Sequence, residues 1–412
     1  MTPRPHPSDS FAPLQRLMLN DSWASSRSDG VHLAQVEIQF VSSISLQCVS
    51  LAWSATVSTT DALRMAFSVE NGIPRAHPLS AIPAGQSLKI EPERPACWDA
   101  WRKLARQQIR LGPAHAPWTA HYWPAQRRLI WTFHHALLDG RSIARVLENF
   151  LHHLADRASS PLPLATWRRP GPEEVDAAKT YFQTLRPHLT RPSFPDSMLD
   201  LQEQGASSEP RPAIRHLGRD FAETLNNQIA SHPTLSVPSL LIWTWGQSLC
   251  ELAKVDSVVV EQVRCGPRVT KNDVACAGFT MTTFPILIHR AEKENWLVGL
   301  DEFRRALTDL RDIEAVSDLD FPPGEFPDLS AAAASVIMVE RGTLRHMVGE
   351  VACAGLLESL ELHEPTSEWP TASAYLLPTM QLQVEGPGRH LLLEAWIRHL
   401  QAALPLIRDA GA

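Results

Sequence analysis

The sequence predicts a mixed fold of class α/β (α+β), built as two lobes. Strand-like and helix-like stretches interleave in both halves of the chain, which is typical of mixed folds. The 412 residues are enough for two ordinary domains with a sizeable core. Hydrophobic residues make up 44% of the chain and charged residues 20%, which is the composition of a globular protein.

Regular patterning marks four stretches of the first half. They are a strand at 31–41, a stretch at 45–65 that fits a strand or a helix, two strands around a polar turn within 121–133, and a helix at 142–154. Asp139 and Gly140 stand just before the last of these, as in a natural turn into a helix.

Proline is frequent, with 33 residues, and it is densest between residues 159 and 212. Only 173–189 within this stretch has the pattern of a helix. Such a stretch is typical of a connector that runs over a surface. We therefore predict an N-terminal lobe at 1–160, a connector at 161–215 and a C-terminal lobe at 216–412.

The second half repeats the alternation of strands and helices. The predicted helices are 221–230, 237–253, 296–313 and 391–406, and the predicted strands are 257–264, 279–289, 334–340 and 380–384.

Charge and cysteine usage exclude several classes of function. The formal net charge of −7 argues against nucleic acid as the main partner. Apolar runs are all interrupted before they reach membrane-spanning length, and the N-terminus lacks the apolar segment of a signal peptide. The six cysteines are scattered without a C-x-x-C pair, so we expect free thiols in a reducing cytoplasm and no metal site.

The segment with the clearest chemistry contains His134, His135, Asp139 and Gly140. It has the form of a strand that ends in two histidines, followed by a short apolar loop and a turn into a helix. Neighbouring strand residues point to opposite faces, so one histidine can face a cavity while the other braces the core. Asp139 can anchor the turn, and Gly140 can take a backbone angle that other residues avoid. A histidine held rigidly there suits general acid–base chemistry near neutral pH.

This segment resembles the H-H-x-x-x-D-G signature of the chloramphenicol acetyltransferase-like superfamily, which includes nonribosomal peptide condensation domains. Weaker likenesses to that family follow in the expected order along the chain, at 11–16, 61–67, 70–72, 256–264, 266–268 and 278–285. The D-F-G-W-G string of the plant-type acyltransferases is absent, so the resemblance favours the condensation type.

The resemblance implies two lobes that form a V, with the histidine in the middle of a central channel. The implied donor is an acyl thioester, on coenzyme A or on the phosphopantetheine arm of a carrier protein, and the implied acceptor is a small-molecule amine or alcohol. The product would be an amide or ester in secondary-metabolite biosynthesis, without a permanently bound cofactor or metal.

The resemblance also assigns roles to individual residues. His135 matches the catalytic base or positioning histidine, and His134 matches a supporting position. Asp139 matches the structural aspartate, and Arg64 matches the arginine that pairs with it. Gly140 would let the backbone pass close to the reaction centre, where its N–H could hold the oxyanion.

Further residues are candidates for lining the channel or contacting substrate. Thr282 stands where the family has asparagine, which changes any amide contact at that point. Arg141, which follows Asp-Gly, could face a phosphate, a carboxylate or solvent. The remaining candidates are Ser142, Thr283 and Trp131.

Structural interpretations compete with these assignments. His134 and His135 could be a core pair, Arg64 a surface residue, and the histidine doublet at 152–153 a solvated or packing face of its helix. Neither His363 nor Glu364 has a partner that the sequence can name.

The competing function is a non-catalytic module that docks carrier proteins or partner enzymes. The intact His135 and Asp139 argue against it, whereas a closed channel or an unformed pair between Arg64 and Asp139 would favour it.

Overall fold

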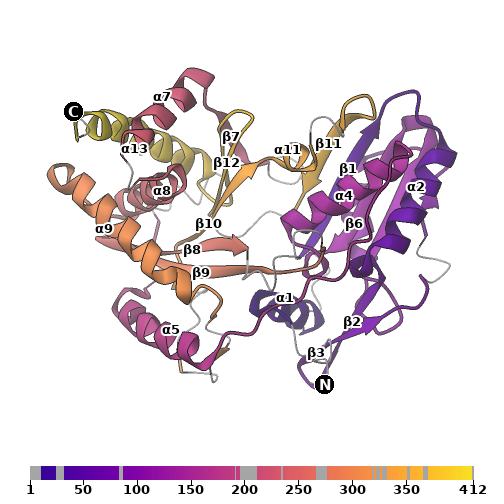
Figure 1. Ribbon diagram of the computed structural model, residues 1–412, viewed down its shortest axis with the longest axis horizontal. Helices are drawn as coiled ribbons and strands as arrows, with labels where there is room; N and C mark the ends of the chain where they lie inside the picture. The colour runs from indigo at the N-terminus through magenta and orange to yellow at the C-terminus, as the bar shows by residue number, and fades with distance from the viewer. Residues whose placement is uncertain are drawn as a thin grey trace. The chain divides into compact units, whose positions relative to one another are not determined.

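The computed structural model of the chain is shown in Figure 1. The structure describes residues 11–24, 32–82, 87–190, 192–194, 211–232, 235–265, 276–317, 320–321, 325–326, 332–349, 353–364 and 370–410. The chain forms two compact units. Unit 1 comprises Met1–Arg169, Cys265–Met281 and Thr343–Pro365, and unit 2 comprises Pro170–Arg264, Thr282–Gly342 and Thr366–Ala412.

A five-stranded sheet is the centre of unit 1, in the order β11-β1-β6-β5-β4. The strands are β1 (Leu33–Phe40), β4 (Lys89–Ile90), β5 (Trp118–Trp123), β6 (Arg128–His134) and β11 (Leu357–His363). The strands predicted at 31–41 and within 121–133 are confirmed. Strand β11 comes from far along the chain and pairs antiparallel with β1.

The helices of unit 1 are α1 (Pro13–Ala24), α2 (Leu46–Thr59), α3 (Trp98–Gln107), α4 (Gly140–Leu154) and the short α11 (Leu344–Val348). Figure 1 shows α2 and α4 along the sheet, and Trp53 of α2 packs edge-on against Trp131 of β6 with ring centroids 5.6 Å apart. The ambiguous stretch at 45–65 is therefore helical over most of its length, because α2 buries its apolar stripe on this core.

The alternation along β1 explains its two faces. Val36, Ile38 and Phe40 are buried apolar residues, and Phe40 contacts Phe150 of α4. The side chains between them are polar. Among these, Glu37 contacts Arg102 of α3 at 2.7 Å, so β1 is covered on both faces.

A β-hairpin lies beside α1 in unit 1. Its strands are β2 (Met65–Glu70) and β3 (Ile73–Pro78). Asn71 and Gly72 connect them with φ values of 54° and 76°, the positive angles of the two-residue turn that matches strand twist.

Unit 2 contains a six-stranded sheet in the order β7-β13-β12-β10-β8-β9. The strands are β7 (Ala213–His216), β8 (Ser257–Cys265), β9 (Met281–His289), β10 (Ser335–Gly342), β12 (Thr371–Leu377) and β13 (Gln381–Glu385). Strands β8, β10 and β12 run parallel, whereas β13 is antiparallel to its neighbours β12 and β7. The four strands predicted for this half are confirmed, and β7 and β12 were not predicted.

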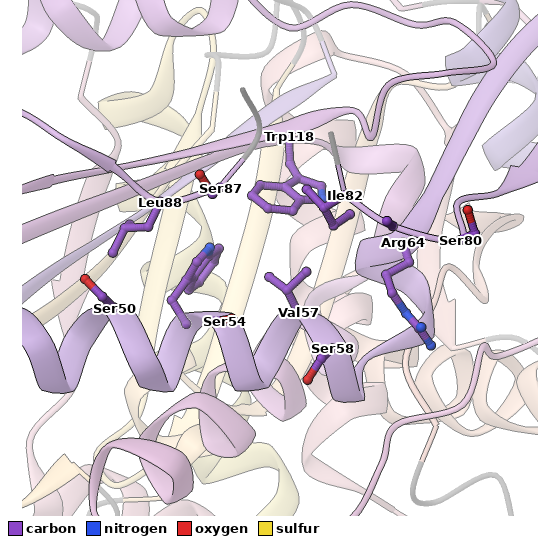
Figure 2. A pocket seen from close by; sticks show the side chains of 12 residues that line it. Ser50, Ser54, Val57, Ser58, Arg64, Ser80, Ile82, Ser87, Leu88 and Trp118 are labelled. Carbon is purple, nitrogen blue, oxygen red and sulfur yellow. The ribbon is translucent and has the colours of Figure 1, made fainter. Parts of the chain in front are cut away.

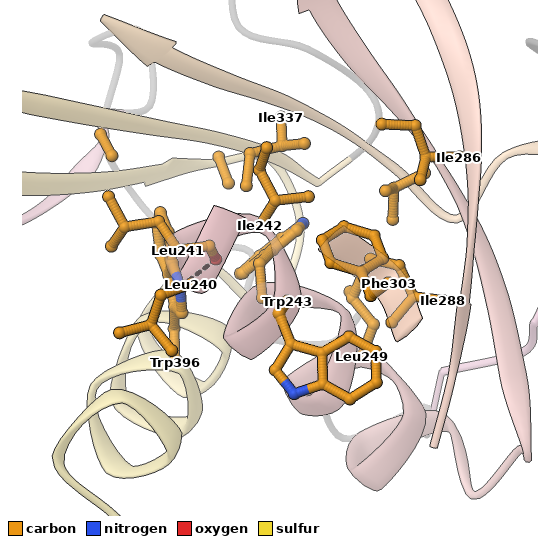
Figure 3. Close-up of a cluster of buried hydrophobic side chains, with 14 of the residues drawn as sticks. Leu240, Leu241, Ile242, Trp243, Leu249, Ile286, Ile288, Phe303, Ile337 and Trp396 are labelled. Carbon is orange, nitrogen blue, oxygen red and sulfur yellow. Dashed lines mark hydrogen bonds between the residues drawn. The ribbon is translucent and has the colours of Figure 1, made fainter. Parts of the chain in front are cut away.

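The helices of unit 2 agree closely with the predictions. They are α5 (Pro172–Leu185), α7 (Arg219–Ala230), α8 (Val237–Ala253), α9 (Trp296–Asp309) and α13 (Arg389–Ala410). Figure 3 shows α8 side chains within a large apolar cluster, where the Trp396 indole donates to the Leu241 carbonyl at 3.1 Å. Helix α8 begins at a Ser236 cap with Pro238 in its first turn, and its first residue, Val237, is the one at which the sequence predicted a helix to begin.

Gly246 allows α8 to approach β9 closely. A Cβ at this position would lie 2.9 Å from the Cβ of Ile288. We expect Gly246→Ala to lower the free energy of unfolding by about 1–3 kcal/mol, because overpacking outweighs the helix propensity of alanine. Urea unfolding measures this. Gly112→Ala is the control because its Cβ would meet no atom within 4 Å, and equal stability of both variants would contradict the packing argument.

The unit boundaries differ from the predicted continuous lobes. Two segments from the second half, 265–281 and 343–365, belong to unit 1. The second segment joins the sheet of unit 1 because β11 pairs with β1, and the first is bound to the start of α4 through Gly278 and Thr280. The predicted connector is also divided, since 161–169 belongs to unit 1 and α5 packs its Phe182 into the core of unit 2. Sequence patterning shows periodicity but not which sheet a strand joins.

Helices long and apolar enough to cross a membrane are absent from the described parts of the chain. The V-shaped arrangement implied by the family resemblance stays a prediction.

Candidate active site

The two histidines of the motif stand where β6 ends. The His134 ring is buried, and its Nδ1 accepts a hydrogen bond from the Ala136 N–H at 3.1 Å. The proton of the neutral ring is therefore on Nε2, which donates to the Ser22 hydroxyl at 2.9 Å. Burial lowers the pKa of His134 to about 3, and the neighbouring His32 and His135 add to this. His134 is therefore a neutral brace between β6 and α1, not a base.

His135 has a different environment. Its Nδ1 lies 2.9 Å from the Leu138 carbonyl oxygen, which can only accept, so the Nδ1 proton is fixed. Its Nε2 lies 3.2 Å from Oε1 of Glu364, and the side chain is 18% exposed. The Phe279 ring packs edge-on with its centroid 6.0 Å from that of the imidazole. One nitrogen thus orients the ring, and the other faces a carboxylate.

The charge of His135 follows from this geometry. Burial alone lowers the pKa, but the Glu364 carboxylate and the backbone contact with Leu138 outweigh burial and raise it to about 9. Burial raises the pKa of Glu364, and His135 reverses that effect and lowers it. The pair is therefore an imidazolium beside a carboxylate at neutral pH.

Asp139 holds the loop after His135. It is 5% exposed and caps α4, because its Oδ1 accepts from the Ser142 N–H at 2.9 Å. Its Oδ2 accepts from the Thr280 N–H at 2.9 Å and from the Thr280 hydroxyl at 3.1 Å. The Asp139 N–H donates to the Gly278 carbonyl at 3.1 Å. Asp139 therefore ties the motif to the segment at 276–281.

The first turn of α4 corrects part of the sequence interpretation. The special backbone angle predicted for Gly140 is wrong, because Gly140 is the first residue of α4 and its φ is outside the left-handed region. Arg141 is exposed. Ser142 is buried, and its hydroxyl accepts from the Gly278 N–H at 3.1 Å, so it fastens the same segment as Asp139.

Arg64 does not pair with Asp139, and that prediction is wrong. Its Nη2 donates instead to Asp61 three residues earlier, at 2.6 Å. Arg64 lines a cavity of about 460 Å³ together with Trp53 and Trp118 (Figure 2). Figure 2 shows the Arg64 side chain at one end of this cavity, below Ser80. The Asp139 carboxylate is bound instead by Thr280 and Ser142.

The Arg64 contact predicts a small effect on stability. We expect Arg64→Ala to lower the free energy of unfolding by less than about 1 kcal/mol, because a half-exposed ion pair within one turn contributes little. Urea unfolding provides the measurement, with Asp61→Ala as the matched control. A loss of several kcal/mol for Arg64 alone would contradict the pairing seen here.

The other channel candidates are placed as follows. Trp131 of β6 is fully buried against Trp53 of α2, so the prediction that it lines a channel is wrong. Thr282 is 1% exposed and Thr283 half-buried, both in β9 of unit 2. Their contact with substrate stays a prediction. The likeness noted at 266–268 lies outside the described residues.

Sequence reasoning missed three residues that position the motif. Glu364 follows β11, and the register that pairs Gln35 with His363 and Leu33 with His134 brings it to His135. Thr280 binds Asp139, and Gln15 of α1 donates from Nε2 to the Ala136 carbonyl at 2.7 Å. Strand β11 was not predicted, although residues 357–363 have a strand-like pattern. That pattern was the signal in the sequence that could have pointed to Glu364.

The sequence and the fold were compared with those of known proteins. No family model matches the chain. A nonribosomal peptide synthetase of Gibberella zeae, GRA1, is 22% identical over 281 residues, which are 64% of this chain and 3% of that protein. The chain thus spans a small fraction of the curated relative.

Solved structures match over nearly the whole chain. The epimerization domain from the third module of tyrocidine synthetase B has a TM-score of 0.69 at 14% identity and covers 97% of this chain and 96% of its own. The condensation domain of the monacolin K polyketide synthase MokA has a TM-score of 0.71 at 12% identity, with coverages of 95% and 96%. A variant of the starter condensation domain of rhizomide synthetase RzmA, in complex with C8-CoA and Leu-SNAC, has a TM-score of 0.63 at 13% identity, with coverages of 98% and 95%. The chain therefore has the fold shared by the condensation and epimerization domains of peptide and polyketide synthetases.

Proposed function

We propose that the chain is a condensation-type acyltransferase that moves an acyl group from a thioester to an amine or hydroxyl acceptor. The observation that carries this proposal is the fixed tautomer of His135. Its Nδ1 is committed to Leu138, so Nε2 is the only ring nitrogen that can exchange a proton with a substrate. Asp139, Thr280 and Gln15 hold the surrounding loop, which supports a positioned general base.

The reaction needs one proton acceptor near the acceptor atom. When Nε2 of His135 is deprotonated, it can take the proton of the acceptor nitrogen or oxygen as that atom attacks the thioester carbon, and the C–S bond breaks. The departing thiolate then takes that proton, which regenerates the base. Gly140 supports this chemistry because the direction of a Cβ there is open, so a substrate can approach the backbone closely.

The donor is a thioester on coenzyme A or on the phosphopantetheine arm of a carrier protein. A starter condensation domain of the same fold was solved with C8-CoA, which supports coenzyme A as one carrier of the acyl group. The condensation-domain fold and the likeness to a nonribosomal peptide synthetase support secondary-metabolite biosynthesis as the setting. Exposed free thiols at Cys48 and Cys97 fit a reducing cytoplasm.

A non-catalytic docking module is the second candidate, because the pair between Arg64 and Asp139 is not formed. The unformed pair does not favour the docking module, because Thr280 and Ser142 hold Asp139 in place of Arg64. Turnover of thioester substrates then distinguishes the acyltransferase from the docking module.

The test supplies the purified chain with acyl-CoA thioesters of several chain lengths and with the same acyl groups on a carrier protein. Amines and alcohols are present as acceptors, and free thiol and product mass are followed together. Thiol release matched by a new amide or ester supports the acyltransferase, and the better donor identifies the carrier. Carrier binding without turnover across the panel would favour the docking module.

A further inference from the structure

We propose that Glu364 makes this site selective for acceptors that arrive as primary ammonium ions, by binding the cation and so releasing Nε2 of His135 for catalysis. The inference rests on the proposed acyltransferase and names its acceptor class. It starts from one juxtaposition, the Glu364 carboxylate 3.2 Å from the only His135 nitrogen that can act as a base.

The first step is that Nε2 is occupied in the resting state. A deprotonated Nε2 would set its lone pair against the lone pairs of the Glu364 oxygen, and both are acceptors. The contact at 3.2 Å is favourable only when Nε2 carries a proton. His135 therefore rests as an imidazolium, in which form it cannot accept a proton from an acceptor.

A cation bound at Glu364 would favour loss of the proton from Nε2 of His135. Glu364 is 43% exposed, so an incoming group can reach its carboxylate. An ammonium ion beside the carboxylate compensates its charge, which removes the main cause of the raised pKa of His135. Burial and the new positive charge then both favour the neutral ring. A neutral hydroxyl provides no such compensation.

Other charged groups near His135 do not replace Glu364. His134 is neutral because its pKa is lowered to about 3. Asp139 caps α4 and binds Thr280. Nε2 of His32 lies 2.8 Å from Oδ2 of Asp21, and the backbone carbonyl of His32 accepts a hydrogen bond from the backbone N–H of His135. Among the described residues, Glu364 is the carboxylate that contacts Nε2.

Protons balance over one catalytic cycle. Cation binding sends the Nε2 proton of His135 to solvent. The ammonium ion then gives one proton to Nε2, and the neutral amine attacks the thioester carbon. The N–C bond forms, the C–S bond breaks, and the amine's excess proton goes to the thiolate. The products are an amide, a thiol and one released proton, and His135 returns to its protonated resting form.

The first test measures His135 directly and needs no turnover. Histidine-selective ¹⁵N NMR follows the His135 ring, assigned with His135→Gln, during titrations with butylammonium chloride and with 1-butanol. We expect the wild-type pKa of about 9 to fall when butylammonium is added and to stay unchanged with butanol. In Glu364→Gln we expect a pKa at or below the ordinary 6.5, with no response to butylammonium.

The second test compares turnover of a matched amine and alcohol. We expect Glu364→Gln to lower the ratio of amine to alcohol kcat/KM by roughly tenfold to a hundredfold, which is the effect of losing a charge-assisted contact. The alcohol rate of the wild type should rise as pH approaches about 9, because Nε2 then loses its proton, and that rise should occur at lower pH in Glu364→Gln.

Glu358→Gln is the matched control, since Glu358 lies on β11, the strand that ends just before Glu364, and binds Arg127 away from the motif. It should leave the NMR titration and the selectivity ratio unchanged. An unchanged His135 titration in Glu364→Gln, or an unchanged amine-to-alcohol ratio, overturns the inference while acyl transfer stands. Absence of turnover with every donor and acceptor would instead reject the acyltransferase, and the NMR result would still decide whether Glu364 controls His135.

Discussion

Replacing His135 by alanine is expected to lower acyl transfer by roughly two to four orders of magnitude, the usual contribution of a positioned general base. Its Nε2, which contacts Glu364, is the ring nitrogen that can exchange a proton with a substrate, because Nδ1 is bound to the Leu138 carbonyl. The measurement is kcat/KM from thiol release together with product mass.

The control for that variant is His152→Ala. His152 is a half-buried histidine on α4, in the same unit but outside the motif, and its loss should leave the rate unchanged. Urea unfolding of both variants separates lost chemistry from lost structure. A His135→Ala variant that is stable and retains wild-type turnover would reject His135 as the base, and equal losses in both variants would point to a general structural effect.

Asp139→Ala is expected to lower the free energy of unfolding by about 3 kcal/mol and to reduce turnover as well. The substitution removes the cap of α4 and leaves the N–H groups of the buried Ser142 and the half-buried Thr280 without their acceptor. The loop that carries His135 is then released from the segment at 276–281. Urea unfolding gives the stability change, and the thiol assay gives the rate.

Asp139→Asn provides the graded control. Its amide oxygen can still cap α4 through the Ser142 N–H, but its amide nitrogen cannot accept from Thr280. We expect an intermediate loss of stability. Thr280→Val tests the same contact from the other side, because valine removes the hydroxyl and keeps the backbone donor. Wild-type stability in Asp139→Ala would show that the carboxylate does not anchor the loop.

The local elements of the site were predictable from the sequence because their causes are local. Helix α4 has apolar residues at helical spacing, and its cap is Asp139, three residues before the N–H that it binds. Strand β6 is a mostly apolar run that ends at His134. The motif could therefore be located at a junction between strand and helix without any coordinates.

The contacts that give His135 and Asp139 their properties are long-range, and local patterning does not encode them. Thr280 binds Asp139 across 141 residues of sequence. Arg64 illustrates the opposite failure, since family likeness suggested a distant partner and the chain supplied Asp61 three residues away.

The sequence by itself determined the mixed fold class, most of the strands and helices, and the motif with its local cap. Only the tertiary structure decided which sheet each strand joins, and that decision controls the chemistry. Strand β11 pairs with β1 in a register that sets Glu364 beside His135, and its carboxylate keeps the imidazole charged in spite of its burial. The physical reason is that backbone pairing and charge compensation depend on distances in space, which a linear pattern does not contain.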